Sequence, residues 1–154
     1  MEDFEAGYGK DCQFIQGTGD LSLLSMDGIK KIRGYAIGRK AVIAFYVFGS
    51  TATGKSRPGS DIDLAVMVAG AFSGMERVEM ETALSNLLCR DVDLVVFGQA
   101  TPLLQHQILK YGRLIYDAAP HERILQEVGA RRHYLDIAFL YKKIKIWRND
   151  AYGG

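Results

Sequence analysis

The segment AVIAFYVFGSTATGKSRPGSDIDLAVMV, residues 41–68, contains two strand-like runs separated by a loop of small and turn-forming residues. Residues 41–48 are apolar, β-branched or aromatic, which is typical of a buried strand, and residues 62–68 predict a second strand. The loop between them predicts no helix, whereas parallel neighbours need a crossover of about a dozen residues, usually a helix. A purely parallel, doubly wound sheet therefore does not fit, and a mixed sheet fits better.

Outside this segment, helical patterns alternate with short strands. Thr101-Pro102 has the form of a helix cap followed by proline at the first helical position. The fold class is α/β (α+β): a mixed sheet of about four strands, packed by helices, in a single domain over residues 1–154 whose residues 1–20 are loosely organised. We expect helices over 21–38, 75–89, 101–112 and 120–148, and strands over 41–48, 62–68, 91–97 and 113–116.

The composition is that of an ordinary globular domain. The 154 residues are 48% hydrophobic and 24% charged, with a net charge of +1, so disorder and coiled coil are poor readings of the whole chain. A generic polyanion binder would be far more basic, and we expect no direct DNA binding. The longest apolar run has eight residues, where a membrane span needs about 20, and the acidic N-terminus lacks a signal-peptide core. We expect a cytoplasmic protein without a membrane partner.

Residues 49–56, GSTATGKS, match the P-loop pattern G-x-x-x-x-G-K-[ST] and follow a hydrophobic strand. A P-loop leads directly into a helix whose N-terminal N–H groups hold the phosphates. Only four residues lie between Ser56 and Asp61, and they include Pro58 and Gly59. No helix fits there, so the P-loop is the weaker interpretation of this loop.

Carboxylates gather on one face of two predicted strands. Side chains alternate along a strand, so Asp61 and Asp63 share a face, opposite to their apolar neighbours. Asp93 lies in the run 91–97, which alternates in the same way, and Asp91 shares its face. If the two strands are neighbours, three or four carboxylates project from one side of the sheet.

Such a cluster is unfavourable without a counter-charge. Two unit charges about 4 Å apart repel by about 1 kcal/mol in bulk water and by about 4 kcal/mol at an effective dielectric of 20. A divalent cation removes this repulsion, and clustered carboxylates suit Mg²⁺ or Mn²⁺, completed by water and substrate phosphate. The small residues around Ser50 let backbone N–H groups approach a phosphate closely. The sequence therefore predicts a metal–nucleotide site.

At these residues the sequence resembles the nucleotidyltransferase superfamily that includes the polymerase-β-type palm. The signature of that superfamily is G-S, a spacer, D-x-D, and a third acid on a neighbouring strand. The corresponding residues here are Gly49, Ser50, Asp61, Asp63 and Asp93.

More closely, the chain is similar to the minimal nucleotidyltransferases, and to those of them that serve as antitoxins to HEPN-domain toxins. The likeness spans about residues 40–145. The segments that carry it are 49–64, 92–95, 103–116 and the helix that contains RRHYL, residues 131–135.

The resemblance implies a palm-like sheet and a transfer of AMP from ATP that depends on two Mg²⁺ ions. It implies Asp61, Asp63 and Asp93 as the metal ligands and catalytic residues, with Asp93 also helping to deprotonate the acceptor hydroxyl. Gly49 and Ser50 would lie near the triphosphate. The implied acceptor is a tyrosine of a partner HEPN-type RNase toxin. Adding AMP there silences the toxin, so this chain would be a protein adenylyltransferase antitoxin.

One position departs from the pattern of these relatives. They often read G-S-x-A-R-G, and this chain has Thr53 in place of the arginine. A cation that could meet the triphosphate is therefore missing, and we assign its role to Lys55 and Arg57 in the same loop. The departure leaves open a nucleotide-binding antitoxin that acts by contact without catalysis. A further alternative is nucleotidyl transfer to a small molecule such as an aminoglycoside.

The expected C-terminal helix, residues 120–148, carries more apolar residues than the single stripe of an amphipathic helix. This surplus predicts contact with a partner or with a second copy of the chain. The apolar residues that nearly encircle the helix are Ile137, Phe139, Leu140, Tyr141, Ile144, Ile146 and Trp147.

Overall fold

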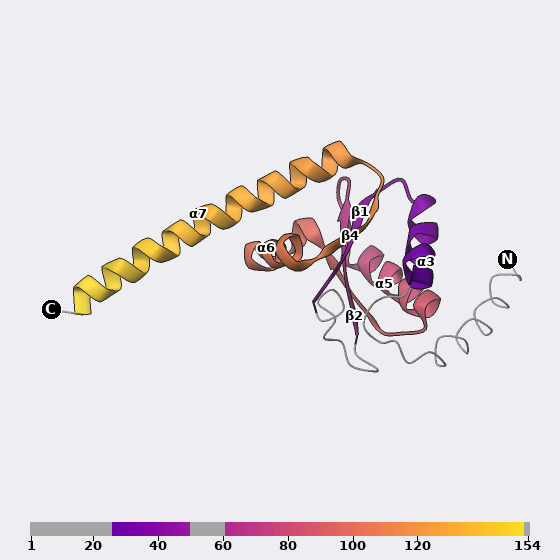
Figure 1. The fold of residues 1–154 in the computed structure, drawn as a ribbon, viewed down its shortest axis with the longest axis horizontal. Coiled ribbons are helices and arrows are strands. Elements are labelled where there is room, and N and C mark those ends of the chain that lie inside the picture. Colours follow the sequence, from indigo (N-terminus) through magenta and orange to yellow (C-terminus); the bar gives the residue numbers. More distant parts are fainter. Residues whose placement is uncertain (1–25, 50–60, 153–154) are drawn as a thin grey trace, which may run out of the picture.

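The computed structural model describes residues 26–49 and 61–152 (Figure 1). Its centre is a four-stranded sheet with the order β3-β2-β1-β4. Strand β1 pairs antiparallel with β2 and β4, whereas β2 and β3 run parallel, so the predicted mixed sheet is confirmed. The strands are β1 (Val42–Phe48), β2 (Ile62–Val68), β3 (Val92–Val96) and β4 (Arg113–Asp117). The helices are α3 (Met26–Ile37), α5 (Gly74–Leu88), the short η2 (Phe97–Gln99), α6 (Pro102–Tyr111) and α7 (Pro120–Tyr152).

Helices cover both faces of the sheet, because the strands are apolar on both sides. On one face, Leu64 and Val66 of β2 pack with the buried residues of α3 and α5. On the other face, Ala65 and Met67 pack with Ile108 of α6 and Ala130 of α7. Asp63 alternates with Ala65 and Met67, so it points to the side that α6 and α7 cover farther along the strand.

Side chains of α5 hold the outer edge of β3, which is a terminal strand of the described sheet. The N–H of Val92 donates to Ser85 Oγ at 3.1 Å, and the N–H of Leu94 donates to Glu81 Oε2 at 2.9 Å. Arg77 donates to the Leu94 carbonyl oxygen at 3.3 Å and forms an ion pair with Glu81. Edge strands expose unpaired backbone groups, and here α5 pairs them.

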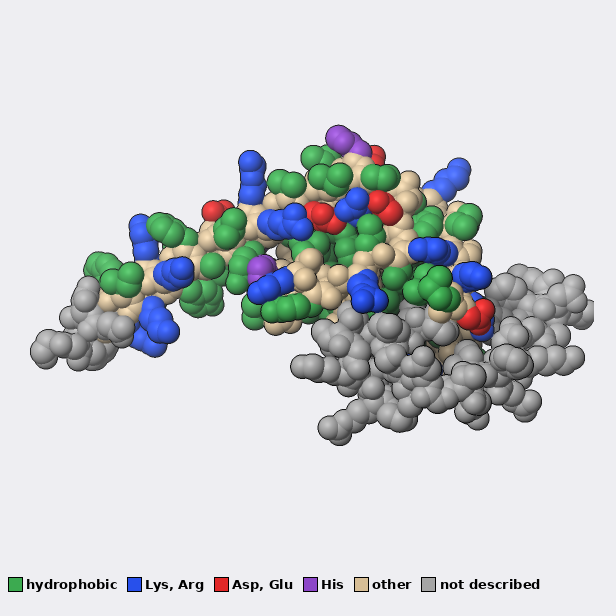
Figure 2. Space-filling view, in the orientation of Figure 1, with side chains coloured by type: hydrophobic (Ala, Val, Ile, Leu, Met, Phe, Trp, Pro, Cys, Tyr) green, Lys and Arg blue, Asp and Glu red, His purple; other side chains and the backbone are tan. Residues whose placement is uncertain are grey.

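Helix α7 is anchored to the domain at its beginning. Arg123 bridges Asp117 of β4 and Glu127, with N–O distances of 2.9 and 2.8 Å, and the Tyr46 hydroxyl donates to Glu127. From residue 139 to residue 148 every side chain is exposed, and this part of the helix extends away from the domain (Figures 1 and 2). We call residues 139–148 the α7 arm.

The predicted elements are found close to their expected bounds. Thr101 caps α6 by accepting from the Leu104 N–H at 3.3 Å, with Pro102 in the first turn, as predicted. The predicted strand 91–97 is shorter, because Phe97 already belongs to η2. The expectations for residues 1–20 and for the start of the first helix lie outside the described residues. In the described part of the chain, no helix combines the length and apolarity that crossing a bilayer requires.

The start of α5 has a capping box that can be tested. Ser73 Oγ accepts from the Glu76 N–H at 3.1 Å, and the Ser73 N–H donates to Glu76 Oε2 at 2.7 Å. We expect Ser73→Ala to lower the free energy of unfolding by about 1 kcal/mol, which corresponds to about 2–4 °C in melting temperature. Ser73→Thr keeps the cap and is the matched control. Thermal unfolding followed by circular dichroism measures both, and equal melting temperatures for wild type and Ser73→Ala would contradict the assignment.

Candidate active site

The carboxylates predicted from the sequence meet at one end of the parallel pair β2 and β3. Asp63 and Asp93 are direct partners in the register of these strands, and Asp61 lies just before β2. The register is fixed at this end by the Ile62 N–H, which donates to the Asp91 carbonyl oxygen at 2.9 Å. Asp61 and Asp93 are exposed, whereas Asp63 is partly buried. The condition set by the sequence, that the two strands be neighbours, is met.

The charges of this cluster act on one another. Burial raises the pKa of the Asp63 carboxyl above its ordinary value, and the carboxylates of Asp93 and Asp61 raise that pKa further. Asp91 is not among the groups that perturb Asp63; its described role is the backbone contact with Ile62. The site therefore contains three interacting acids, with Asp63 in the middle.

Gly49 brings the end of β1 against the same carboxylate. Phe48 is paired with Asp63 across the sheet, and Gly49 follows with a positive φ of 67°. A Cβ built at position 49 would overlap Asp63 Oδ2 and lie 3.1 Å from Asp63 Cγ. Both the backbone conformation and the close approach require glycine. The first residue of the G-S signature is thus in contact with the D-x-D.

The donor set has the chemistry of a site for Mg²⁺ or Mn²⁺. It consists of carboxylate oxygens only, and their mutual repulsion is the interaction that a divalent cation would relieve. Among the described residues, no group of three or more His, Cys, Asp or Glu side chains is already arranged to hold a metal ion. The residues therefore fit the ion in type and position, while the exposed Asp61 and Asp93 would adjust their side chains to hold it.

The other predicted nucleotide-binding residues, Ser50, Lys55 and Arg57, lie outside the described residues, as does Thr53. The element described after this loop is β2, an antiparallel neighbour of β1. A P-loop instead leads from its strand into a helix and a parallel crossover. The antiparallel pairing therefore argues against the P-loop interpretation of residues 49–56.

Two features of the site were missed by sequence reasoning. The first is the contact between Gly49 and Asp63, which the positive φ of Gly49 makes possible. The second is the pair of hydrogen bonds that Ser85 and Glu81 accept from the N–H groups of Val92 and Leu94 at the edge of β3. These two bonds flank Asp93 and position it. The only sequence signal for the second feature is a polar residue on the side of α5 that faces the sheet. Many surface helices have such a residue, so the signal is not specific.

Comparison with known proteins agrees with this geometry. The family described as polymerase beta, nucleotidyltransferase matches residues 30–121. The protein adenylyltransferase MntA of Shewanella oneidensis is 35% identical over 71 residues, which are 46% of this chain and 51% of that protein. The chain therefore spans about half the length of the curated relative that it matches.

Solved structures share the fold over a longer part of the chain. A chain in the crystal structure of a toxin–antitoxin with AMP-PNP has a TM-score of 0.68 and 26% identity, and the match covers 75% of this chain and 94% of that one. The tri-AMPylated Shewanella oneidensis HEPN toxin in complex with MNT antitoxin has a TM-score of 0.62 and 24% identity, covering 76% and 92%, which shows the likeness of fold. Since the family matches well over half of the sequence, and Gly49, Asp63 and Asp93 meet as its signature requires, the chain belongs to the polymerase beta nucleotidyltransferase family.

Proposed function

We propose that this protein transfers AMP from ATP to a tyrosine hydroxyl of a HEPN-type RNase toxin, with Mg²⁺, and thereby acts as its antitoxin. The observation that carries the proposal is the pairing of Asp63 with Asp93 beside Gly49 at one end of the sheet. Two relatives support the choice of reaction and acceptor. MntA is a protein adenylyltransferase, and the HEPN toxin in the related complex is AMPylated.

The chain would catalyse this reaction mainly by positioning the reactants and by stabilising the charge of the transition state. The acceptor hydroxyl oxygen forms a bond to the α-phosphorus, the bond from that phosphorus to the β-phosphate oxygen breaks, and pyrophosphate leaves. The hydroxyl proton passes to the carboxylate of Asp93, which lies on β3 at the edge of the described sheet. Backbone N–H groups at Gly49-Ser50, with Lys55 and Arg57, are the proposed contacts of the triphosphate.

Asp61, Asp63 and Asp93 are the residues that would hold Mg²⁺. Bound there, the ions would supply positive charge that stabilises the attacking and leaving oxygens of an in-line displacement. Asp63 is central because it lies between the other two acids and is the least exposed of the three. Its carboxylate must be ionised to bind the cation, so its raised pKa weakens metal binding as the pH falls toward that pKa.

Labelled ATP tests the reaction. The pure protein, Mg²⁺ and ATP labelled at either the α or the γ phosphate are added to a lysate of the source cell. We expect the α label, and not the γ label, to appear on one protein band, whose mass then identifies the acceptor. Asp63→Asn should abolish the labelling. Asp91→Asn, the same substitution at an exposed position of the same sheet end, should leave it within about threefold.

Each other outcome would contradict adenylyl transfer to a protein. Label from γ alone would show phosphoryl transfer and return the P-loop to consideration. Silencing of the toxin without any label, together with measurable ATP binding, would establish the antitoxin that acts by contact. Label found only on an added aminoglycoside would establish a small-molecule acceptor.

The α7 arm is the proposed contact surface for the toxin. Four of its exposed apolar residues recur at helical spacing on one side, and Tyr141 and Trp147 are 70% and 79% exposed. An isolated stretch of helix without packing is only marginally stable in water, so a partner that covers this side would also stabilise the arm. The four residues, which we call the arm stripe, are Leu140, Tyr141, Ile144 and Trp147.

The charge of the arm favours a different protein, rather than a second copy of this chain, as its partner. Residues 139–148 contain no Asp or Glu, and two copies packed along their arms would bring only like charges together. A helical surface with acidic residues around an apolar groove is complementary to this arm. The cations of the arm are Lys142, Lys143, Lys145 and Arg148.

A further inference from the structure

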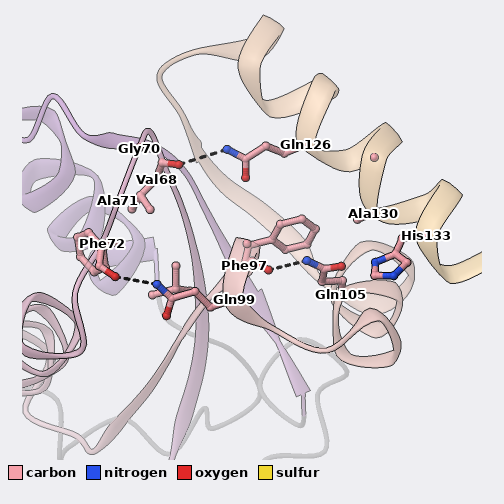
Figure 3. Close-up of a pocket in the computed structure, with 13 residues that line it drawn as sticks. Val68, Gly70, Ala71, Phe72, Phe97, Gln99, Gln105, Gln126, Ala130 and His133 are labelled. Atoms are coloured by element: carbon pink, nitrogen blue, oxygen red, sulfur yellow. Dashed lines mark hydrogen bonds between the residues drawn. The ribbon is translucent and has the colours of Figure 1, made fainter.

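A cavity of about 500 Å³ lies at the end of β2 and β3 that is opposite to the carboxylates. Figure 3 shows the residues that line it. The cavity is open to solvent and is lined by the ends of both strands, by residues 70–72, by η2, by Gln105 of α6 and by one side of α7. Asp63 and Val68 are five residues apart on β2, so the acids and the cavity are separated by about 17 Å along the strand. The cavity has the size of a small-molecule site, and the proposed reaction does not use it.

The lining of the cavity is mainly apolar, and its polar side chains are three glutamines and one histidine. Among its described lining residues there is no Lys, Arg, Asp or Glu, and the apolar walls include Phe72 and Phe97. Helix α7 contributes Gln126, Gly129 and His133, which lie three or four residues apart and hence on one side of the helix. Without Lys or Arg among its described lining residues, the cavity lacks the side chains that most often bind a phosphate group.

Gln105 is the most buried of the polar residues that line the cavity, with 8% of its surface exposed. Its Nε2 donates to the Phe97 carbonyl oxygen at 2.7 Å, which fixes the orientation of the amide, because a carbonyl can only accept. Among the described residues no donor reaches its Oε1. In the described part of the chain, the one fully buried side-chain oxygen or nitrogen without a hydrogen-bond partner is Asp117 Oδ1. Gln105 Oε1 is therefore not fully buried, and it is accessible from the cavity that Gln105 lines.

Two further glutamines repeat this arrangement at the wall. Gln126 Nε2 donates to the Val68 carbonyl oxygen at 3.2 Å, and Gln99 Nε2 donates to the Phe72 carbonyl oxygen at 2.7 Å. Each amide therefore uses its NH₂ group on the backbone and keeps its carbonyl oxygen as an acceptor. Gln99 is exposed and Gln126 is partly buried, so Gln105 is the lining amide whose acceptor is least accessible to bulk water.

We propose that this cavity is a second ligand site that takes a flat, uncharged nitrogen heterocycle with N–H donors, the chemical class of an aminopurine base. The donors of such a ring would meet the amide oxygen of Gln105, and its faces would lie against Phe72 and the glycine surface of α7. The cavity is separate from the metal-binding end of the sheet. The ligand expected in it is a base or a nucleoside without a phosphate group.

Calorimetric titration of the full chain with adenosine tests the proposal. The titration is made with Mg²⁺ and saturating AMP-PNP present, so that the nucleotide site at the acids is occupied. We expect adenosine still to bind, and purine riboside, which lacks only the 6-amino group, to bind about tenfold more weakly. Gln105→Met, which removes the acceptor, should remove this tenfold preference.

A matched pair of glycine variants controls for folding. A Cβ built on Gly129 or on Gly34 meets no atom within 4 Å, and leucine is the better helix former, so neither variant should unfold the domain. Gly129→Leu fills the cavity and should abolish adenosine binding, whereas Gly34→Leu on α3 should not change it. Displacement of adenosine by AMP-PNP, unchanged binding in Gly129→Leu, or no binding to the wild type would each overturn the proposal.

Discussion

Asp63→Asn is expected to lower adenylyl transfer by a hundredfold or more and, in the same protein, to raise the melting temperature measured without divalent cation. The loss of transfer follows from the position of Asp63 between the two other acids, where a neutral amide cannot hold a metal ion. Removal of one preorganised charge-stabilising group typically costs about a hundredfold to a thousandfold in rate. The gain in stability follows from removing a charged carboxylate from a partly buried position and from relief of its repulsion with Asp93 and Asp61.

The direction of the stability effect with pH follows from the raised pKa of Asp63. The folded protein binds this proton more tightly than the unfolded chain does, so stability falls as the pH rises from the unfolded pKa through the folded pKa. The penalty is fully present above the folded pKa, hence at neutral pH. The stabilisation by Asp63→Asn should therefore be largest at neutral pH and disappear once the pH is below the unfolded pKa.

Thermal unfolding with and without Mg²⁺ measures this prediction. Without the ion we expect Asp63→Asn to melt above the wild type at pH 7, which is the direction set by the raised pKa of Asp63. Mg²⁺ should stabilise the wild type and not the variant. Asp91→Asn serves as the control. A variant that melts below the wild type, or that Mg²⁺ stabilises equally, would show that Asp63 is not the centre of a cation site.

Deletion of residues 141–154, which leaves a chain that ends at Leu140, is expected to weaken toxin binding at least a hundredfold while ATP affinity stays within about threefold. The deletion removes most of the arm stripe, and large aromatic residues typically dominate the energy of an interface. The domain keeps its anchors on α7, because the bridge from Arg123 to Asp117 and Glu127 and the buried Ala130 lie before the cut.

Two point variants separate the arm stripe from the rest of the helix. Trp147→Ala removes the most exposed member of the stripe and should weaken toxin binding about thirtyfold, equivalent to about 2 kcal/mol. Ile146→Ala, next to it but on another side of the helix, should change the affinity by less than threefold. Titration of the purified toxin measures both affinities. Unchanged toxin affinity after the deletion would reject the α7 arm as the contact surface.

Local sequence was sufficient for the helices and strands because their signals are local. The apolar run 42–48, the alternation along 62–68 and the cap at Thr101-Pro102 each depend on neighbours within a few residues. The absence of a helical pattern between the first two strands also excluded an all-parallel sheet, and the antiparallel pairing of β1 with β2 confirms this. The end of the third strand was placed one residue too late, since η2 begins at Phe97.

The site divides differently. Alternation alone places Asp61 and Asp63 on one side of their strand, and the G-S and D-x-D signature identifies the class of chemistry. That Asp63 faces Asp93 depends on a parallel register between segments 30 residues apart, which α5 closes by pairing its side chains with the edge of β3. The sequence raised this pairing as a condition and could not establish it.

The sequence by itself thus determined the family signature, the candidate acids and the apolar excess of the C-terminal helix. Only the tertiary structure placed Gly49 against Asp63, raised the pKa of that carboxyl, and opened the cavity beside Gln105 at the far end of the same strands. The physical reason is the distance along the chain over which each effect acts. Propensity and alternation act over a few residues along the chain, whereas charge repulsion, steric fit and the lining of a cavity depend on groups that meet only after the sheet and its helices have packed.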